Sequence, residues 1–331
     1  MAGNKILIKK PAWSEISQYR DFISKAKYKS CSQFSEIPAQ ALTDWFLNEI
    51  EAIKDSSPKI LLAEIKDEPI ALLSLHKLEW DTAHFGIPMG KIKHILGGVE
   101  PDRDLAAKRL LVNSATKEFK KMGIRHISIR LPVDDVNGIY ALEREKYYLE
   151  DTIVEYYFDF CKQKIPEVPH QCRLRLYQAS DFQMIKEGVK GIFEGYLDRF
   201  HRDLHLDNAK SDELYEKWMI NSCKGLADDC IIATIDGRLA GVSTLVTYKN
   251  VNSVLPLRFG EIILSGVVSE FRGKRVYTSM INFGQNYFKG KIDLLRVATQ
   301  VNNFYVQKAW TILGFHLKYA FHTFHCYLYG G

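Results

Sequence analysis

An internal repeat constrains this chain more than any other feature. When the 331-residue sequence is shifted by 168 residues, 147–160 falls on 315–328, and both runs predict strands rich in aromatic residues. Upstream, 108–131 falls on 276–299, so that a helix followed by a strand recurs. The order and spacing of apolar residues repeat although few residues are identical, which is typical of a duplicated structural unit. We therefore expect two related domains, each large enough to bury its own core.

The boundary between these domains is predicted at KIPEVPH (164–170), where two prolines stand between polar residues after a strand-like run. We expect domains at 1–165 and 166–331. In the second, strand and helix patterns are mixed along the chain, including a hairpin that turns at Asp236 and Gly237. The predicted fold class is therefore mixed α/β.

Composition excludes several classes of protein. Hydrophobic residues make up 46% and charged residues 26%, which argues against long disorder. The net charge of +5 is spread over 45 basic and 40 acidic residues, so we expect no nucleic-acid partner. Because no apolar run approaches a membrane span or a leader peptide, we expect no membrane partner and a cytoplasmic location. The six cysteines include no CxxC pair and predict reduced thiols, and a homodimer is compatible with the sequence.

The segment VVSEFRGKRVYTSMI (267–281) carries the chemistry. It predicts a buried strand, a short loop with a glycine and three cations, and an amphipathic helix. Unpaired N–H groups and the positive end of the helix dipole converge at such a helix start and favour an anion such as pyrophosphate. About 30 residues later, Asn303 precedes a short predicted helix that ends at Gly314 and Phe315.

These residues resemble the GCN5-related N-acetyltransferase (GNAT) superfamily, whose pattern is R/Q-x-x-G-x-G/A after the fourth strand and N-x-x-A-x-x-x-Y-x-x-x-G-F near the end. The resemblance spans the second half of the chain. Within the superfamily, RFHRD (199–203), VQKAWTILGF (306–315) and LEWDTAHFG (78–86) look most like the dTDP-fucosamine acetyltransferase group. Those enzymes acetylate the 4-amino group of a nucleotide-linked 4-amino-4,6-dideoxyhexose, which implies acetyl-coenzyme A as cofactor and a primary amine, on a nucleotide-sugar, as acceptor.

The resemblance also implies roles for individual residues. Glu261 resembles a general base and Tyr305 is a candidate acid, while Arg199, His201 and Asp203 would line the acceptor site. The backbone N–H of Val268 would hold the oxyanion. The implied cofactor-binding residues are Gly266, Val267, Val268, Arg272, Gly273, Lys274, Arg275, Val276, Tyr277 and Asn303.

Three departures and several alternatives stay open. Arg275 and Tyr277 stand where small residues are usual, and Trp310 stands where many relatives have a tyrosine acid. An indole N–H is no useful proton donor, so the acid falls to Tyr305, Tyr277 or a water. Glu261 could equally be a strand carboxylate paired with a basic neighbour, and the 199–203 segment a solvated loop.

The first half is predicted not to bind coenzyme A, because Asp104 and Leu105 fall on Arg272 and Gly273 under the repeat. His201 and His205 could share a helix face, yet we expect no metal. His322 and His325 should point to opposite faces of the closing strand. Two further functions remain: a peptidoglycan-type aminoacyl transferase, which normally lacks an intact coenzyme A loop, and a non-catalytic ligand-binding protein.

Overall fold

The computed structural model describes residues 5–53 and 59–329, and it divides into two compact units. Unit 1 comprises Met1–Thr152 and Ala320–Gly331, and unit 2 comprises Ile153–Tyr319. This division differs from the linear halves expected at 165 and 166. The reason is strand pairing: residues 153–159 pair with a strand of unit 2, and the chain's last strand pairs with a strand of unit 1.

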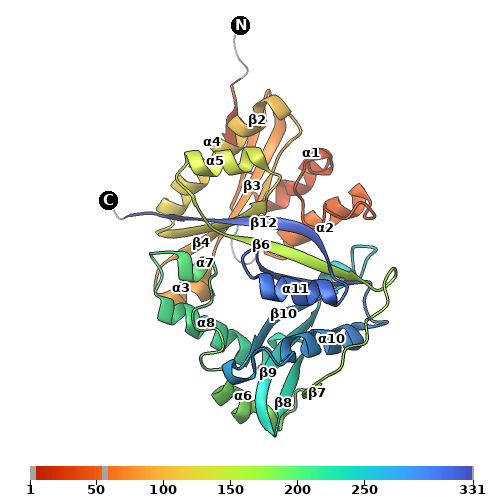
Figure 1. The fold of residues 1–331 in the computed structure, drawn as a ribbon. Helices are drawn as coiled ribbons and strands as arrows, with labels where there is room; N and C mark the ends of the chain where they lie inside the picture. The colour runs from red at the N-terminus through yellow and green to blue at the C-terminus, as the bar shows by residue number, and fades with distance from the viewer. Residues whose placement is uncertain (1–4, 54–58, 330–331) are drawn as a thin grey trace. The chain divides into compact units, whose positions relative to one another are not determined.

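Unit 1 has a six-stranded sheet in the order β1-β2-β3-β4-β5-β12, with β4 and β5 parallel and the other pairs antiparallel (Figure 1). Its strands are β1 (Leu7–Lys9), β2 (Lys59–Ile65), β3 (Glu68–Lys77), β4 (Met89–Leu96), β5 (His126–Pro132) and the end of β12 (His316–Tyr327). Its helices are α1 (Arg20–Lys25), α2 (Ala39–Glu51), α3 (Glu79–Phe85), α4 (Pro101–Lys121) and α5 (Val136–Arg144), with a 3-10 helix at Trp13–Tyr19.

Alternation along its strands buries both faces of the unit 1 sheet. Leu61 and Leu73 pack with Leu111 and Phe119 of α4. On the opposite face, Leu62 packs in a second cluster with residues of α1 and α2. Helices therefore cover both faces of this sheet.

Unit 2 repeats this design with a sheet ordered β7-β8-β9-β10-β11-β6, in which only β10 and β11 are parallel. Its strands are β7 (Arg173–Leu176), β8 (Asp229–Ile235), β9 (Arg238–Thr247), β10 (Phe259–Val267), β11 (Leu294–Gln300) and the end of β6 (Tyr148–Asp159). Its helices are α6 (Phe182–Gly188), α7 (Arg199–Arg202), α8 (Asn208–Asn221), α9 (Lys249–Asn252), α10 (Val276–Phe288) and α11 (Phe304–Ile312).

Helix α10 packs closely on the unit 2 sheet. Met280 and Phe288 are fully buried in a cluster with Ile262 and Val297. A Cβ at Gly284 would come within 2.5 Å of Ile262, so a glycine is needed for this close approach. The predicted hairpin is confirmed: Asp236 and Gly237 both have positive φ between β8 and β9.

The structure confirms the repeat. The bounds of α5 and α11, of β5 and β11, and of β6 and β12 all differ by 168 residues at both ends. For β2 and β8, and for β3 and β9, the difference is 170. Two residues are therefore extra in unit 1, between β3 and β5. Among residues 5–53 and 59–329, every helix is too short or too polar to cross a bilayer.

Candidate functional site

A bulge in β10 separates the two parallel strands of unit 2. Strands β10 and β11 pair from Phe259 to Ile262, and the pairing then stops although both strands continue. At the same point, the register of β10 against β9 shifts between Ile262 and Ser265. We call this unpaired part the split: residues 263–267 of β10 and 298–300 of β11. Backbone groups on this edge of β10 are left for another partner.

Strand alternation decides which N–H groups face the split. The N–H of Val268 donates to the carbonyl of Ala240 in β9 at 3.0 Å. Gly266, two residues earlier, therefore faces β9 as well, whereas the N–H groups of Ser265 and Val267 face the split. The expectation that Val268 holds an oxyanion is thus wrong, because the bulge changes which residues face outward. Ser265 and Val267 are the available donors.

The loop after β10 forms an anion-binding arrangement. Gly273 and Arg275 both have positive φ, at 78° and 57°, and Arg275 is the N-cap of α10. No side-chain hydrogen bond caps this helix start, and within the described chain the N–H groups of Gly273, Arg275 and Val276 donate to no backbone carbonyl. Residues 272–275 are exposed. Such converging amides at a helix start suit a phosphate group.

The Arg272 side chain ties this loop to the segment between α6 and α7. Its guanidinium donates to the carbonyl of Ile192 at 3.0 Å and to that of Val267 at 3.3 Å. Ile192 also packs against Gly266, where an added Cβ would lie 2.3 Å from its Cγ2. Arg272 therefore fixes the loop rather than presenting a fully unpaired cation. The Lys274 ammonium lies 5.1 Å from the centre of the Phe271 ring.

The buried Trp310 and the half-buried Tyr277 form a hydrogen-bonded pair. Trp310 is 2% exposed, and its indole N–H donates to the Tyr277 hydroxyl at 3.0 Å. Burial raises the pKa of the Tyr277 hydroxyl far above its usual range, so it keeps its proton at neutral pH. This arrangement makes Tyr277 a hydrogen-bonding group and a poor acid.

Glu261 is buried in an ion-pair network. Its carboxylate accepts from the Tyr248 hydroxyl and, at 3.0 Å, from the guanidinium of Arg296. Arg296 also donates to Glu155 of β6, whose other oxygen accepts from Tyr157 at 3.0 Å. Burial opposes the charge of Arg296, but Glu261 and Glu155 raise its pKa overall. The contacts match the alternative in which Glu261 pairs with a basic neighbour.

Two further candidate residues follow the end of β11. Tyr305 is 92% exposed on α11. Asn303 is the N-cap of α11, as expected, and its side-chain amide donates to Thr299 at 3.0 Å. That bond holds the turn between β11 and α11.

The candidate acceptor segment is organised by carboxylates. Asp198 caps α7 and accepts from the imidazole of His201 at 2.8 Å, while the other ring nitrogen of His201 lies 3.0 Å from Asp212. Burial alone would lower the pKa of His201, yet these two carboxylates outweigh it and raise the pKa. Arg199 stacks on the Phe200 ring, 4.2 Å from its centre.

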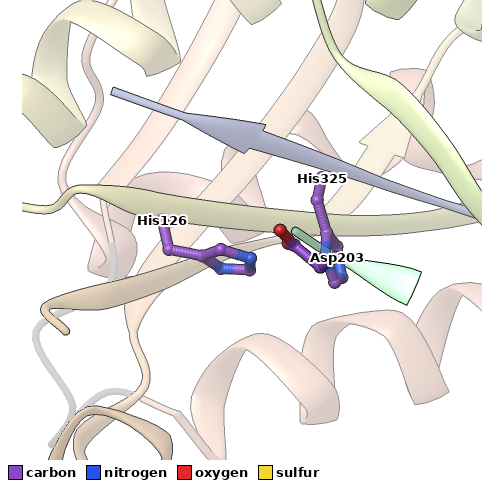
Figure 2. A group of neighbouring side chains, drawn as sticks. All are labelled: His126, Asp203 and His325. Atoms are coloured by element: carbon purple, nitrogen blue, oxygen red, sulfur yellow. The ribbon is translucent and has the colours of Figure 1, made fainter. Parts of the chain in front are cut away.

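Asp203, which Figure 2 labels, is 3% exposed. Its carboxylate accepts from the backbone N–H and the imidazole of His205. Arg199 and His201 are thus held by the segment itself. Their role toward an acceptor stays a prediction.

Unit 1 lacks the loop. Under the 168-residue relation, residues 101–107 of α4 fall on 269–275, so two helical turns replace the anion-binding loop. The Asp104 carboxylate accepts from the N–H of Gly98 at 2.7 Å, so this amide already has an anionic partner within the protein. It also pairs with the fully buried Lys108 at 3.1 Å. That unit 1 does not bind coenzyme A stays a prediction.

The histidines of β12 lie on opposite faces, as predicted, because His322 is paired with Leu131 and His325 with Ser128. In unit 1, the rings of His126 and His325 meet edge to face at 4.6 Å (Figure 2). The Nδ1 atom of His322 and the Thr152 hydroxyl are hydrogen-bonded at 2.9 Å. We find these contacts consistent with packing of paired strands.

Comparison with solved structures identifies the fold. A GCN5-related N-acetyltransferase from Sphaerobacter thermophilus is similar over 98% of this chain and 96% of its own, with a TM-score of 0.64 and 14% identity. A tandem GNAT protein from the clavulanic acid biosynthesis pathway is similar over 99% of this chain and 100% of its own length, with a TM-score of 0.60 and 12% identity. The chain therefore has the tandem GNAT fold.

A third similar structure is the glucosamine N-acetyltransferase region of a fungal multi-domain β-N-acetylglucosaminidase. It matches 98% of this chain and 38% of its own, with a TM-score of 0.64 and 12% identity. The sequence matched no family model and no curated protein.

Several residues of this site carried no readable signal in the sequence. Ser265 faces the split only because of the bulge, and Arg296 meets Glu261 only because their strands pair. Asp198 did carry one, since an aspartate before a short helical run is a typical N-cap.

Proposed function

We propose that unit 2 is an acetyl-coenzyme A-dependent N-acyltransferase that acts on a primary amine. The observation that carries the proposal is the combination of the split with the anion-binding loop at the start of α10. The amides of Gly273, Arg275 and Val276 would hold the pyrophosphate, and the edge of β10 would align the pantetheine arm. When bound, acetyl-coenzyme A supplies an activated acetyl group. The N–H of Ser265 would stabilise negative charge on the carbonyl oxygen.

The acceptor would enter on the α6–α8 side of the sheet. Residues 188–193 already pack against that face, since Gly188 contacts Leu239 and Ile192 contacts Gly266. The resemblance to dTDP-4-amino-4,6-dideoxyhexose acetyltransferases makes nucleotide-linked amino sugars the first acceptors to test, and the fungal glucosamine N-acetyltransferase region adds free amino sugars.

Isothermal titration calorimetry with acetyl-coenzyme A tests the cofactor. We expect Gly273→Asp to weaken binding about 100-fold, or ~2.7 kcal/mol, because it adds a negative charge beside the phosphate site. Gly290→Asp is the matched control, since Gly290 has the same φ of 78° and equally open surroundings. No binding by the wild type, or equal binding by both variants, would refute the proposal. Release of free thiol with a panel of amino sugars then identifies the acceptor.

A non-catalytic ligand-binding protein is the second candidate. The neutralised Glu261 and the Tyr277–Trp310 pair favour it, because neither offers an evident base or acid. Tight binding of acetyl-coenzyme A without thiol release across the amine panel would support this function over transfer.

A further inference from the structure

A second tyrosine lies at the split. Acyl transfer from a thioester leaves a thiolate, which is protonated most easily by a nearby hydroxyl. Trp310 cannot serve, Tyr305 is exposed, and Tyr277 keeps its proton. Another phenol in this part of unit 2 is Tyr196, between α6 and α7, which contacts the unpaired end of β11.

Tyr196 is held at the end of β11. Its hydroxyl donates to the Gln300 side-chain carbonyl and lies 3.3 Å from the Thr299 hydroxyl. Both contacts place the hydroxyl at the last two residues of β11. Its ring meets Tyr215 edge to face at 5.6 Å, and Tyr215 in turn donates to the buried Asp198. The phenol is therefore positioned by packing and not only by its hydroxyl.

Strand register places this hydroxyl level with the split amide. Ile262 is the last residue of β10 that is paired with β11, opposite Val297. From Ile262 to Ser265, three residues of β10 span only two residues of β9, so the bulge adds one residue to β10 and sets Ser265 level with Thr299. The Tyr196 hydroxyl, 3.3 Å from the Thr299 hydroxyl, and the N–H of Ser265 thus belong to the same level of the two diverging strands. A thioester whose carbonyl oxygen meets Ser265 would bring its sulfur near that level.

We propose that Tyr196 is the catalytic acid of unit 2, an inference that rests on the proposed function. The amine nitrogen bonds to the carbonyl carbon, the carbon–sulfur bond breaks, and its electron pair stays on sulfur. Sulfur takes the proton of the Tyr196 hydroxyl. The phenolate is then reprotonated by the proton that the acceptor nitrogen loses, so charge and protons balance.

Coenzyme A itself is the probe, and no acceptor is needed. A hydroxyl that donates to sulfur favours the thiolate, so binding of coenzyme A near pH 8 should release protons, counted by calorimetry in buffers of different ionisation enthalpy. We expect Tyr196→Phe to abolish this release while its affinity for desulfo-coenzyme A stays at the wild-type value. Tyr287→Phe, on α10 where the ring contacts the Lys291 ammonium, is the matched control and should behave as wild type.

The possible results distinguish a failure of the proposed function from a failure of the role of Tyr196. Failure of the wild type to bind coenzyme A overturns the proposed function. Normal binding with equal proton release in wild type and Tyr196→Phe overturns only the role of Tyr196. Once an acceptor is known, Tyr196→Phe should lower kcat about 100-fold and leave the KM for acetyl-coenzyme A unchanged.

Discussion

Lys108 of α4 offers the sharpest test of how unit 1 is built. Its side chain is fully buried, with the ammonium 2.6 Å from Asp135 and 3.1 Å from Asp104. Lys108→Met keeps the length of the side chain and removes the charge, so two buried carboxylates lose their shared cation. Removing one partner of a buried ion pair costs about 3–5 kcal/mol of the free energy of unfolding. Burial already raises the pKa of Asp135, so the loss should shrink at acid pH, where that carboxyl is neutral.

Amide hydrogen exchange measures this loss where it occurs. A cost of about 3–5 kcal/mol corresponds to roughly 10²–10⁴-fold faster exchange of the buried amides in α4 and α5. The control is Lys117→Met, an exposed position on the same helix, which should change stability by less than ~0.5 kcal/mol. Adding Asp104→Asn to Lys108→Met should restore part of the protection. If Lys108→Met exchanged like Lys117→Met, the ion pairs would contribute nothing net and the reasoning would fail.

Three further predictions concern unit 2. Gly266→Ala should cost about 1–3 kcal/mol by overpacking against Ile192, and should weaken acetyl-coenzyme A binding; thermal melting and calorimetry check both. Trp310→Phe should cost at least about 1–3 kcal/mol, because the Tyr277 oxygen loses its buried donor, which urea denaturation measures. The stabilisation from His201 should be complete below pH about 6.5 and disappear as pH rises through its raised folded-state pKa; melting temperatures from roughly pH 6 to 9 should show this in the wild type and not in His201→Gln.

The local sequence pattern was enough to predict the helices and strands of the repeat. It was not enough to predict which strands pair over long distances in the sequence. The helix that starts after Asn303 and the hairpin at Asp236 follow from spacing and turn chemistry, and both are confirmed. The exchange of β6 and β12 between the halves depends on partners distant in sequence, which apolar spacing does not encode. For the same reason the sequence could suggest that Glu261 meets a basic residue but could not identify Arg296.

The oxyanion donor shows a second limit. Val268 was expected from the family resemblance, whereas the bulge between Ile262 and Ser265 decides which residues of β10 face β9. Val268 was the wrong choice because parity beyond a bulge depends on its position. Nothing in the run IILSGVV marks that position, since every residue there is compatible with a strand.

The divergence of the two units comes down to seven residues. In unit 2, positive φ at Gly273 and Arg275 keeps 269–275 out of the helix and leaves its first amides for an anion. In unit 1, Leu105 and Ala107 occupy the equivalent places within α4, and neither adopts positive φ readily. The helix therefore continues, and Asp104 comes to accept from Gly98 while Lys108 neutralises it. One local change therefore accounts for both differences between the units. The longer helix of unit 1 leaves no loop amides for a phosphate, and its own Asp104 carboxylate accepts from the Gly98 amide and pairs with Lys108.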